Sequence, residues 1–452
     1  MLDTRKKMGY IGLLALNFMS MFLIACMGVV GYAMAGEFDA VSQVGLVFAL
    51  ETCFRCTVCP ISGKLGEKLG RKQLLIGALI VYTAAYAVAA FATDFTVILV
   101  TRCLAGAAWA CWMVNSFLLF CDLFGQSEGP KYSGIAQTVG TVSILIAAPV
   151  AGLICKYDWR ITFYVSVPVL VLITVLCAVG LPRSEKSAGG GRMDVAGSLF
   201  CALMLVPFCL AMSLGSLKGW TSPLMLAFYA LTVVGLVGLV LAERRAEDPI
   251  LPVRLLKNRY YLAIFVTSFC FCVATTAGQY VPTYLMEACG VSSTLSGLVS
   301  TPGSVVCAVL TVFLGGYAAK HGRYRGMTVW WCLLSLASGV LMLFVGTPAT
   351  DGFAFLFCML SVFPMGVGQA MQQIVPYTYP MKVLEPKDLA AGSAFMTFSG
   401  IFSGAVSSGI FSALMNSSGG MVTMFRFPIA MFVVMAVFGI FLFRDIKSGE
   451  TL

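Results

Sequence analysis

Three charged side chains stand inside runs of sequence that are otherwise apolar, and their chemistry is the first thing to explain. Glu51 and Arg55 lie in the run 44–62, and Arg102 lies in the run 95–121. A charged group inside a bilayer is costly unless it is paired or hydrated, so such residues are functional candidates by default. The three are therefore the first candidates for a functional site.

The spacing of these residues indicates that they share one place. Glu51 and Arg55 are four residues apart, which puts them on one face of a helix and allows them to pair. Counted from the run ends near 44 and 95, Glu51 and Arg102 lie equally deep, about 10 Å at the helical rise per residue. Burial favours a neutral carboxyl group and a neighbouring guanidinium favours the charged form, so Glu51 is a candidate proton carrier. The alternative is a fixed ion pair, with Arg55 or Arg102, that only orders the helices.

The composition places these residues in a membrane protein. Hydrophobic residues make up 59% of the chain and charged residues 11%, whereas a soluble domain carries about 25% charged residues. A helix that crosses the bilayer needs about 20 mostly apolar residues. Fourteen such runs are expected, at 10–36, 44–62, 73–92, 95–121, 132–155, 161–181, 195–215, 223–242, 260–285, 295–318, 327–346, 353–376, 389–414 and 422–443.

The distribution of positive charge predicts the topology. An even number of spans puts both termini on one side of the membrane. Twenty-three lysines and arginines fall in the loops and tails that would then be cytoplasmic, and three fall in the outside loops. This bias predicts cytoplasmic termini, with an N-terminus that is retained rather than cleaved. The net charge of +9 then reflects topology and acidic lipid rather than nucleic acid.

The chain repeats itself coarsely, which predicts two related halves. Gly63 and Gly70 are seven residues apart before an arginine, and Gly315 and Gly322 repeat that spacing. We expect parallel six-helix halves with the substrate pocket between them at the middle of the membrane. The expected divisions are an N-terminal bundle (1–182), a linker with two extra helices (183–259) and a C-terminal bundle (260–452).

The segment from Gly63 to Lys72 resembles the signature loop of the major facilitator superfamily, written G-x-L-a-D-r-x-G-r-k. Glu67 replaces the usual aspartate. The matching residues are Gly63, Leu65, Gly70, Arg71 and Lys72. The fourteen spans, the linker 242–259 and the segment Asp158-Trp159-Arg160 are similar to those of fourteen-helix drug:proton antiporters, and this likeness extends over nearly the whole chain.

The resemblance implies roles for further residues. Arg102, with Gly106 four residues on, fits the family's fourth-helix motif and implies proton coupling with Glu51 and Arg55. Glu67 is expected to face the start of the thirteenth helix near Asp388. The fifth-helix antiporter motif is degraded, which leaves the direction of transport open. The residues expected to govern conformational gating are Gly63, Glu67, Gly70, Arg71, Pro149 and Gly152.

Amides and aromatic residues within the spans are the candidate substrate contacts, although buried amides also hold helices together. With almost no fixed acid, they suit an amphipathic molecule that is neutral or anionic. The candidates are Trp109, Trp112, Asn115, Gln279, Tyr280, Gln369, Gln372 and Gln373, with Asn17 and Gln137 nearer the cytoplasmic ends.

The sequence offers no pattern for an enzyme or a cofactor. The segment from Gly63 to Lys72 lacks the Gly-Lys-Ser/Thr end of a phosphate loop, so coupling to ATP is not expected. Cys53, Cys56 and Cys59 follow one side of a helix without a histidine or fourth thiol that would complete a zinc site. No metal and no cofactor are expected.

These observations predict an all-α membrane protein of the major facilitator fold, with two six-helix bundles and two inserted helices. The expected function is proton-coupled export of amphipathic small organic compounds by alternating access, as a monomer in the plasma (inner) membrane. The alternative is a proton symporter for uptake of an organic anion such as a bile acid or carboxylic acid.

Overall fold

The computed structural model is helical in every element that it describes. It describes residues 4–40, 44–125, 128–182, 195–245, 253–281, 284–285, 289–291, 298–321, 324–345, 353–379, 384, 389–415 and 420–442. Within these ranges the side chains of Glu67 and Gln279 are among those outside the description. Apolar runs become helices because a membrane offers backbone groups no water, and a helix satisfies them internally.

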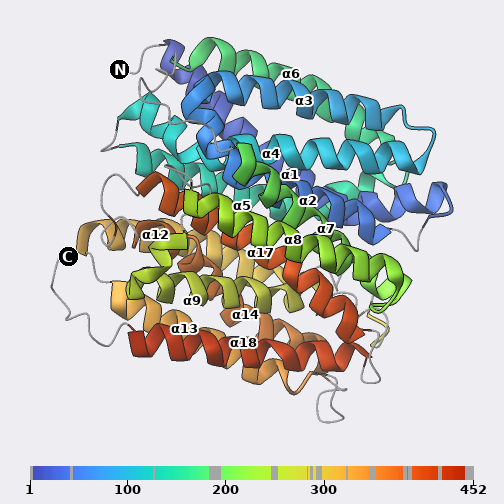
Figure 1. Cartoon of the computed structure of the whole chain (residues 1–452), viewed down its shortest axis with the longest axis vertical. Coiled ribbons are helices and arrows are strands. Elements are labelled where there is room, and N and C mark those ends of the chain that lie inside the picture. Colours follow the sequence, from blue (N-terminus) through green and yellow to red (C-terminus); the bar gives the residue numbers. More distant parts are fainter. Residues whose placement is uncertain are drawn as a thin grey trace. The chain divides into compact units, whose positions relative to one another are not determined.

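The long helices follow the order of the apolar runs (Figure 1). The first eight are α1 (Thr4–Glu37), α2 (Val44–Leu69), α3 (Arg71–Ala90), α4 (Phe95–Phe124), α5 (Gly129–Ile154), α6 (Arg160–Gly180), α7 (Val195–Lys218) and α8 (Pro223–Arg245). The others are α9 (Arg259–Thr275), α12 (Thr301–His321), α13 (Tyr324–Met342), α14 (Ala354–Gln372), α17 (Leu389–Met415) and α18 (Gly420–Leu442). Short helical turns are η2 (Val253–Lys257), η3 (Thr276–Tyr280) and α15 (Val375–Thr378).

A helix lies in each of the fourteen predicted runs, but the described residues do not give every one of them an apolar stretch of membrane-spanning length. Among the described residues, eleven helices are long and apolar enough to cross a bilayer. In α7, α12 and α17 the described apolar stretches are shorter than the helices themselves: Ala196–Met212, Thr301–Thr311 and Phe395–Phe411. Fourteen crossings and cytoplasmic termini therefore stay predictions.

The contacts divide the chain into two units, Met1–Leu251 and Pro252–Leu452. In the first, α2 packs on α4, α1 packs on α5 and α6, and α3 packs on α4 and α6. When the long helices of the second unit are matched to α1–α6 in chain order, the same five pairs pack: α12 on α14, α9 on α17 and α18, and α13 on α14 and α18. The sequence repeat thus corresponds to a repeated pattern of helix packing.

One pair approaches closely in both units because glycines remove side chains from the contact. A Cβ added at Gly106 of α4 would overlap the backbone of Glu51 in α2. In the second unit, a Cβ added at Gly366 of α14 would overlap the backbone of Gly303 in α12. Small residues allow membrane helices to pack at close distance.

The predicted runs end at 62 and begin again at 73, and the expectation that 63–72 forms a loop between them is wrong. Helix α2 continues to Leu69 and α3 begins at Arg71, so Gly70 alone turns the chain, with a φ of 93° that favours glycine. A Cβ at Gly63 would make only an ordinary contact with Val114. Lysine and glutamate are good helix formers, so the basic segment marks the membrane surface without ending the helix.

The two extra helices pack on each other and, through α7, on α2 (Figure 1). The buried thiols of Cys53, Cys56 and Cys59 lie on α2, and the Cys53 thiol donates to the carbonyl oxygen of Val206 in α7 at 3.8 Å. The thiols therefore act here as small hydrophobic groups at a helix contact. Residues 183–194 of the predicted linker lie outside the described residues, and its separate status stays a prediction.

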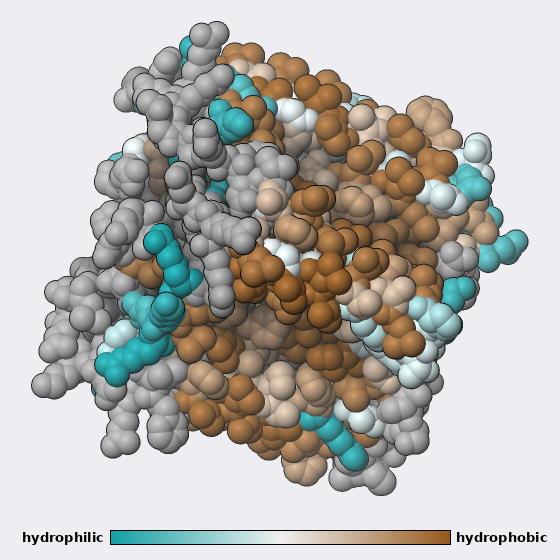
Figure 2. All heavy atoms as spheres, in the orientation of Figure 1, coloured by the Kyte–Doolittle hydropathy of each residue, from teal (hydrophilic) through white to brown (hydrophobic). Residues whose placement is uncertain are grey.

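The surface has the apolar character of a lipid-facing protein. Figure 2 shows hydrophobic residues over most of the coloured surface of the face in view. Exposed valines and leucines run along α6 and α8, including Leu172, Val175, Val233 and Val237. Exposure of this extent is unusual for a soluble protein and is suited to hydrocarbon.

Candidate functional site

The structure brings the three predicted charged residues together inside the first unit. An Arg55 Nη2 donates to Oε1 of Glu51 at 2.5 Å, one turn along α2. Nη1 of Arg102, from α4, lies 3.9 Å from Oε2 of the same carboxylate. The Arg102 side chain is 0% exposed and that of Glu51 is 7% exposed. The spacing argument therefore predicted the geometry of this charged cluster, which we define as Glu51, Arg55 and Arg102.

Close packing of α2 and α4 sets the distance within the charged cluster. Gly106 lies against the carbonyl oxygen of Glu51, so the two helix backbones meet there without side chains between them. Arg102 is one turn from Gly106 along α4 and therefore reaches the Glu51 carboxylate. The arginine and the glycine of the fourth-helix motif thus both lie against Glu51, one near its carboxylate and the other near its backbone.

Aromatic rings lie against both guanidinium groups, and of these Trp109 was a predicted substrate contact, whereas Tyr86 and Phe163 were not predicted. The Arg102 guanidinium lies 4.7 Å from the ring centre of Tyr86 and 5.6 Å from that of Phe163. The Arg55 guanidinium lies 4.3 Å from the ring of Trp109. Such contacts stabilise a cation that has left water. Tyr82 and Tyr86 of α3 are four residues apart, and this spacing was the feature of the sequence that could have indicated their role.

A hydrogen-bonded chain connects the cluster to the rest of the first unit. Tyr86 accepts a hydrogen bond from Nη1 of Arg102 at 3.4 Å and one from the Tyr82 hydroxyl at 3.1 Å. The ring of Tyr82 meets Trp112 edge to face at 4.9 Å. Trp112, with Asn17 and Ser20, lines a small cavity between α1, α3 and α4. Trp112 is thus placed next to the charged cluster rather than within it.

Asn115, a predicted substrate contact, holds two helices together. Its amide group donates to the carbonyl oxygen of Ser62 in α2 at 3.2 Å and to that of Cys111 in α4 at 2.9 Å. Both amide hydrogens are therefore used on backbone groups. Gly66 leaves the space for this contact, because a Cβ there would overlap Oδ1 of Asn115.

The predicted polar residues of the second unit also make contacts between helices. Gln372 donates to Oγ of Ser268 in α9 at 2.8 Å, and its Oε1 has no partner. Gln373 accepts from Thr311 of α12 at 3.5 Å. Tyr280 stacks on Phe411 with ring centres 5.8 Å apart. Gln369 is half-buried on α14, and the side chain of Gln279 lies outside the described residues.

The residues predicted to govern gating have unequal surroundings. Arg71 donates to Oδ1 of Asp122 at 2.8 Å and so ties the start of α3 to the end of α4. Helix α5 passes through Pro149, which is exposed, and a Cβ at Gly152 would meet nothing within 4 Å. The side chain of Glu67 and the residue Asp388 lie outside the described residues, so their proposed contact stays a prediction.

A second polar cluster ties the other end of the first unit. Oε2 of Glu37, at the end of α1, accepts from Nε1 of Trp159 at 2.5 Å and from Nη1 of Arg160 at 2.7 Å. Nη2 of Arg160 donates to the carbonyl oxygen of Ala92 between α3 and α4 at 3.2 Å. Trp159 and Arg160 thus connect the start of α6 to the end of α1 through the Glu37 carboxylate and to the α3–α4 connection through the Ala92 carbonyl group.

Glu37 gives this end a predictable response to acid. The hydrogen bonds from Trp159 and then from Arg160 lower the pKa of the Glu37 carboxyl group below its usual value. A lowered pKa adds stability above the ordinary glutamate range, and this stability is lost as the pH falls through the lowered pKa. We expect Glu37→Ala to lower the melting temperature in detergent at neutral pH, and the difference from wild type to shrink on acidification.

Glu128 provides the control for this prediction, since it is an exposed carboxylate that makes no capping hydrogen bond to α5. Glu128→Ala is expected to leave the melting temperature unchanged. A Glu37→Ala protein as stable as wild type at neutral pH would contradict the assignment.

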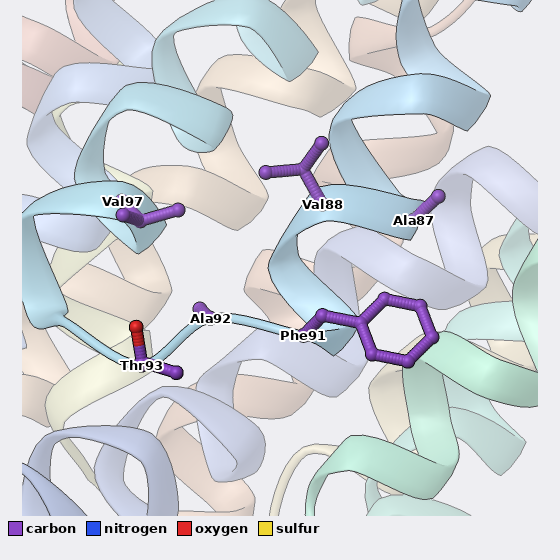
Figure 3. A pocket seen from close by; sticks show the side chains of 6 residues that line it. All are labelled: Ala87, Val88, Phe91, Ala92, Thr93 and Val97. Carbon is purple, nitrogen blue, oxygen red and sulfur yellow. The ribbon is translucent and has the colours of Figure 1, made fainter.

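An open hollow between the ends of α3 and α4 is separate from the charged cluster. It is lined by Ala87, Val88, Phe91, Ala92, Thr93 and Val97 (Figure 3). None of the cluster residues lines it. Its wall is apolar apart from the Thr93 hydroxyl and contains no titratable side chain.

Comparison with known proteins identifies the family. The sequence model of the Major Facilitator Superfamily matches residues 13–407, with a second match at 263–451. "Multidrug transporter protein MdtP" of Bacillus subtilis is 28% identical over 304 residues, covering 66% of this chain and 56% of that protein. "Multidrug resistance protein 3" of the same species is 23% identical over 311 residues, covering 68% and 60%. The chain thus spans less than two thirds of these relatives.

Two solved structures share the fold at low identity. The fucose:proton symporter of E. coli superposes with a TM-score of 0.60 at 16% identity, covering 96% of this chain and 98% of that one. The human organic anion transporter MFSD10 superposes with a TM-score of 0.61 at 14% identity, covering 97% and 100%. Likeness at this identity concerns the fold alone. With the family match over most of the chain, it follows that the protein belongs to the major facilitator superfamily of membrane transporters.

Proposed function

We propose that the chain is a proton-coupled transporter that exports amphipathic small organic compounds across the plasma membrane by alternating access. The names of its relatives support export. One observation carries the proton coupling: within the membrane spans that the structure describes, Glu51 is the only carboxylate. Glu51 is buried, pairs with Arg55 and lies 3.9 Å from Arg102. The interior of a membrane otherwise disfavours a charged side chain.

The proton would act through the contact between α2 and α4. When Glu51 is ionised, its charge offsets Arg55 directly and Arg102 at 3.9 Å. When it is protonated, two like charges remain in a site of low dielectric, and their repulsion weakens the packing at Gly106. The two protonation states therefore favour different arrangements of α2 and α4, which is what coupling to a conformational change requires.

Uptake of an organic anion with protons is the second candidate function. The charged cluster holds one carboxylate against two guanidiniums, and this excess of positive charge favours an anionic substrate. Both candidates use the same carboxylate. They differ in the direction in which substrate and proton move.

Flux measurements in proteoliposomes with an imposed pH gradient test the proposal. We expect the gradient to drive an amphipathic fluorescent compound at least tenfold faster than in protein-free vesicles. Antiport moves the compound against the proton flow, and symport moves it in the same direction. A rate that is independent of the gradient, across a panel of cationic, neutral and anionic amphiphiles, would contradict proton coupling.

A further inference from the structure

The charged cluster has more hydrogen-bond donors than its own residues satisfy. Among the described atoms, Nε and Nη2 of Arg102, Nε of Arg55 and Nε1 of Trp109 are buried without a partner. The Glu51 carboxylate does not supply the missing bonds to Arg102, since its nearest oxygen is 3.9 Å from Nη1. Unpaired donors on a buried guanidinium are costly, so the site is arranged for an acceptor that its own side chains do not provide.

The position of the unpaired atoms indicates the shape of that acceptor. Nε and Nη2 are neighbours on one edge of a guanidinium, and this edge binds a carboxylate through two parallel hydrogen bonds. Tyr86 accepts from Nη1 of Arg102, and the ring centres of Tyr86 and Phe163 lie 4.7 Å and 5.6 Å from the guanidinium carbon, whereas Nε and Nη2 have no partner, which makes their edge the place for an acceptor. A further unpaired donor is Nε of Arg55, whose guanidinium carbon lies 4.3 Å from the ring centre of Trp109.

The charge of the cluster indicates the charge of the ligand. Arg55 and Arg102 together carry two positive charges and Glu51 carries one negative charge. Within the described membrane spans no other carboxylate exists to offset the excess. One additional negative charge would make the cluster neutral, which is the arrangement with the smallest cost in a medium of low dielectric.

We propose that the charged cluster, with Trp109, binds the anionic group of the substrate, and that the substrate is an organic monoanion with an apolar or aromatic body. This inference rests on the proposed transport function and adds the substrate class to it. Arg102 is fully buried in this conformation. Its edge is therefore reached only when the surrounding helices move, as they do in alternating access. The rings of Tyr86, Trp109 and Phe163 provide the apolar surroundings.

Equilibrium binding to the purified full-length protein tests the proposal. The probes are 2-naphthoate and 2-naphthamide, which have the same ring system and differ in charge. By calorimetry in detergent at neutral pH, we expect the protein to bind naphthoate at least tenfold more tightly than naphthamide. Arg102→Gln and Arg55→Gln are expected to reduce this preference to less than threefold. Trp109→Phe keeps an aromatic ring but removes the indole N–H donor, and it should reduce the preference two- to fivefold.

Arg426→Gln is the matched control, because Arg426 is an exposed arginine on α18 of the second unit. It should keep the full preference for naphthoate. The proposal is overturned if the wild-type protein binds the two probes equally or fails to bind naphthoate. It is also overturned if the preference survives in Arg55→Gln and in Trp109→Phe, which are milder changes than loss of the fully buried Arg102.

This experiment separates the substrate class from the proton coupling. The binding experiment uses no pH gradient. Selective binding of naphthoate by a protein that shows no pH-driven flux would therefore support the anion site and contradict proton coupling. If a protein shows pH-driven flux but binds both probes equally, the proposed anion site is contradicted and proton coupling is not.

Discussion

Glu51→Gln is expected to reduce transport driven by a pH gradient to the level of protein-free vesicles, a loss of at least tenfold, while exchange of substrate for substrate continues. Glutamine has nearly the same shape and keeps an oxygen that accepts from Arg55, so the fold should survive. It has no proton to release, so a cycle that requires one stops. Exchange needs no net proton movement and should stay within threefold of wild type.

Two further variants make this prediction decisive. Glu128→Gln removes an exposed carboxylate outside the spans and should leave both rates unchanged. Glu51→Ala also removes the acceptor for Arg55, and breaking a buried pair from one side costs roughly 3–5 kcal/mol, so it should reduce the amount of folded protein. If pH-driven flux persisted in a well-folded Glu51→Gln protein, the ion pair would be structural only.

Gly106→Ala is expected to destabilise the protein by at least about 1–3 kcal/mol, the usual cost of overpacking a close contact. The added methyl group would overlap the carbonyl oxygen and the backbone of Glu51, and backbone atoms do not move aside as a flexible side chain does. The helices α2 and α4 must then separate, which also lengthens the distance between Glu51 and Arg102. Thermal unfolding in detergent measures the loss of stability, and the flux assay measures the loss of transport.

Gly77→Ala is the control for this substitution. Gly77 lies in α3, and a Cβ there would meet no atom within 4 Å. Replacing an exposed helical glycine with alanine stabilises a helix by roughly 0.5–1 kcal/mol, so this variant should be at least as stable as wild type. Equal stability of Gly106→Ala and Gly77→Ala would show that α2 and α4 tolerate separation and that their contact does not set the geometry of the site.

The helices and the charged cluster could be predicted from the sequence because both follow from short-range rules. Apolar runs of sufficient length become helices, and a spacing of four residues places Glu51 and Arg55 on one helix face. The equal depth of Glu51 and Arg102 followed from counting residues along two helices. The only assumption about neighbouring helices that these predictions need is that the second helix packs near the fourth.

The surroundings of the cluster could not be predicted in the same way. Tyr86 and Phe163 cover Arg102 because α3 packs on both α4 and α6, and no spacing within a single helix states that. Asn115 was predicted to contact substrate, but a buried amide also satisfies backbone carbonyl groups, and here its amide hydrogens do so. The basic segment after Gly63 was expected to be a loop between two helices. Its charge indicates where the membrane surface lies but does not show where a helix ends.

Proton movement coupled to substrate movement is the most direct test of the account. Proteoliposomes loaded with substrate and a pH-sensitive dye are diluted into substrate-free buffer, with no imposed pH gradient and with the membrane potential clamped by potassium and valinomycin. We expect outward flow of substrate to acidify the lumen of vesicles that hold the wild-type protein, and vesicles that hold Glu51→Gln to show no change in lumenal pH. Substrate efflux without proton entry in the wild type, or equal acidification with Glu51→Gln, would contradict it.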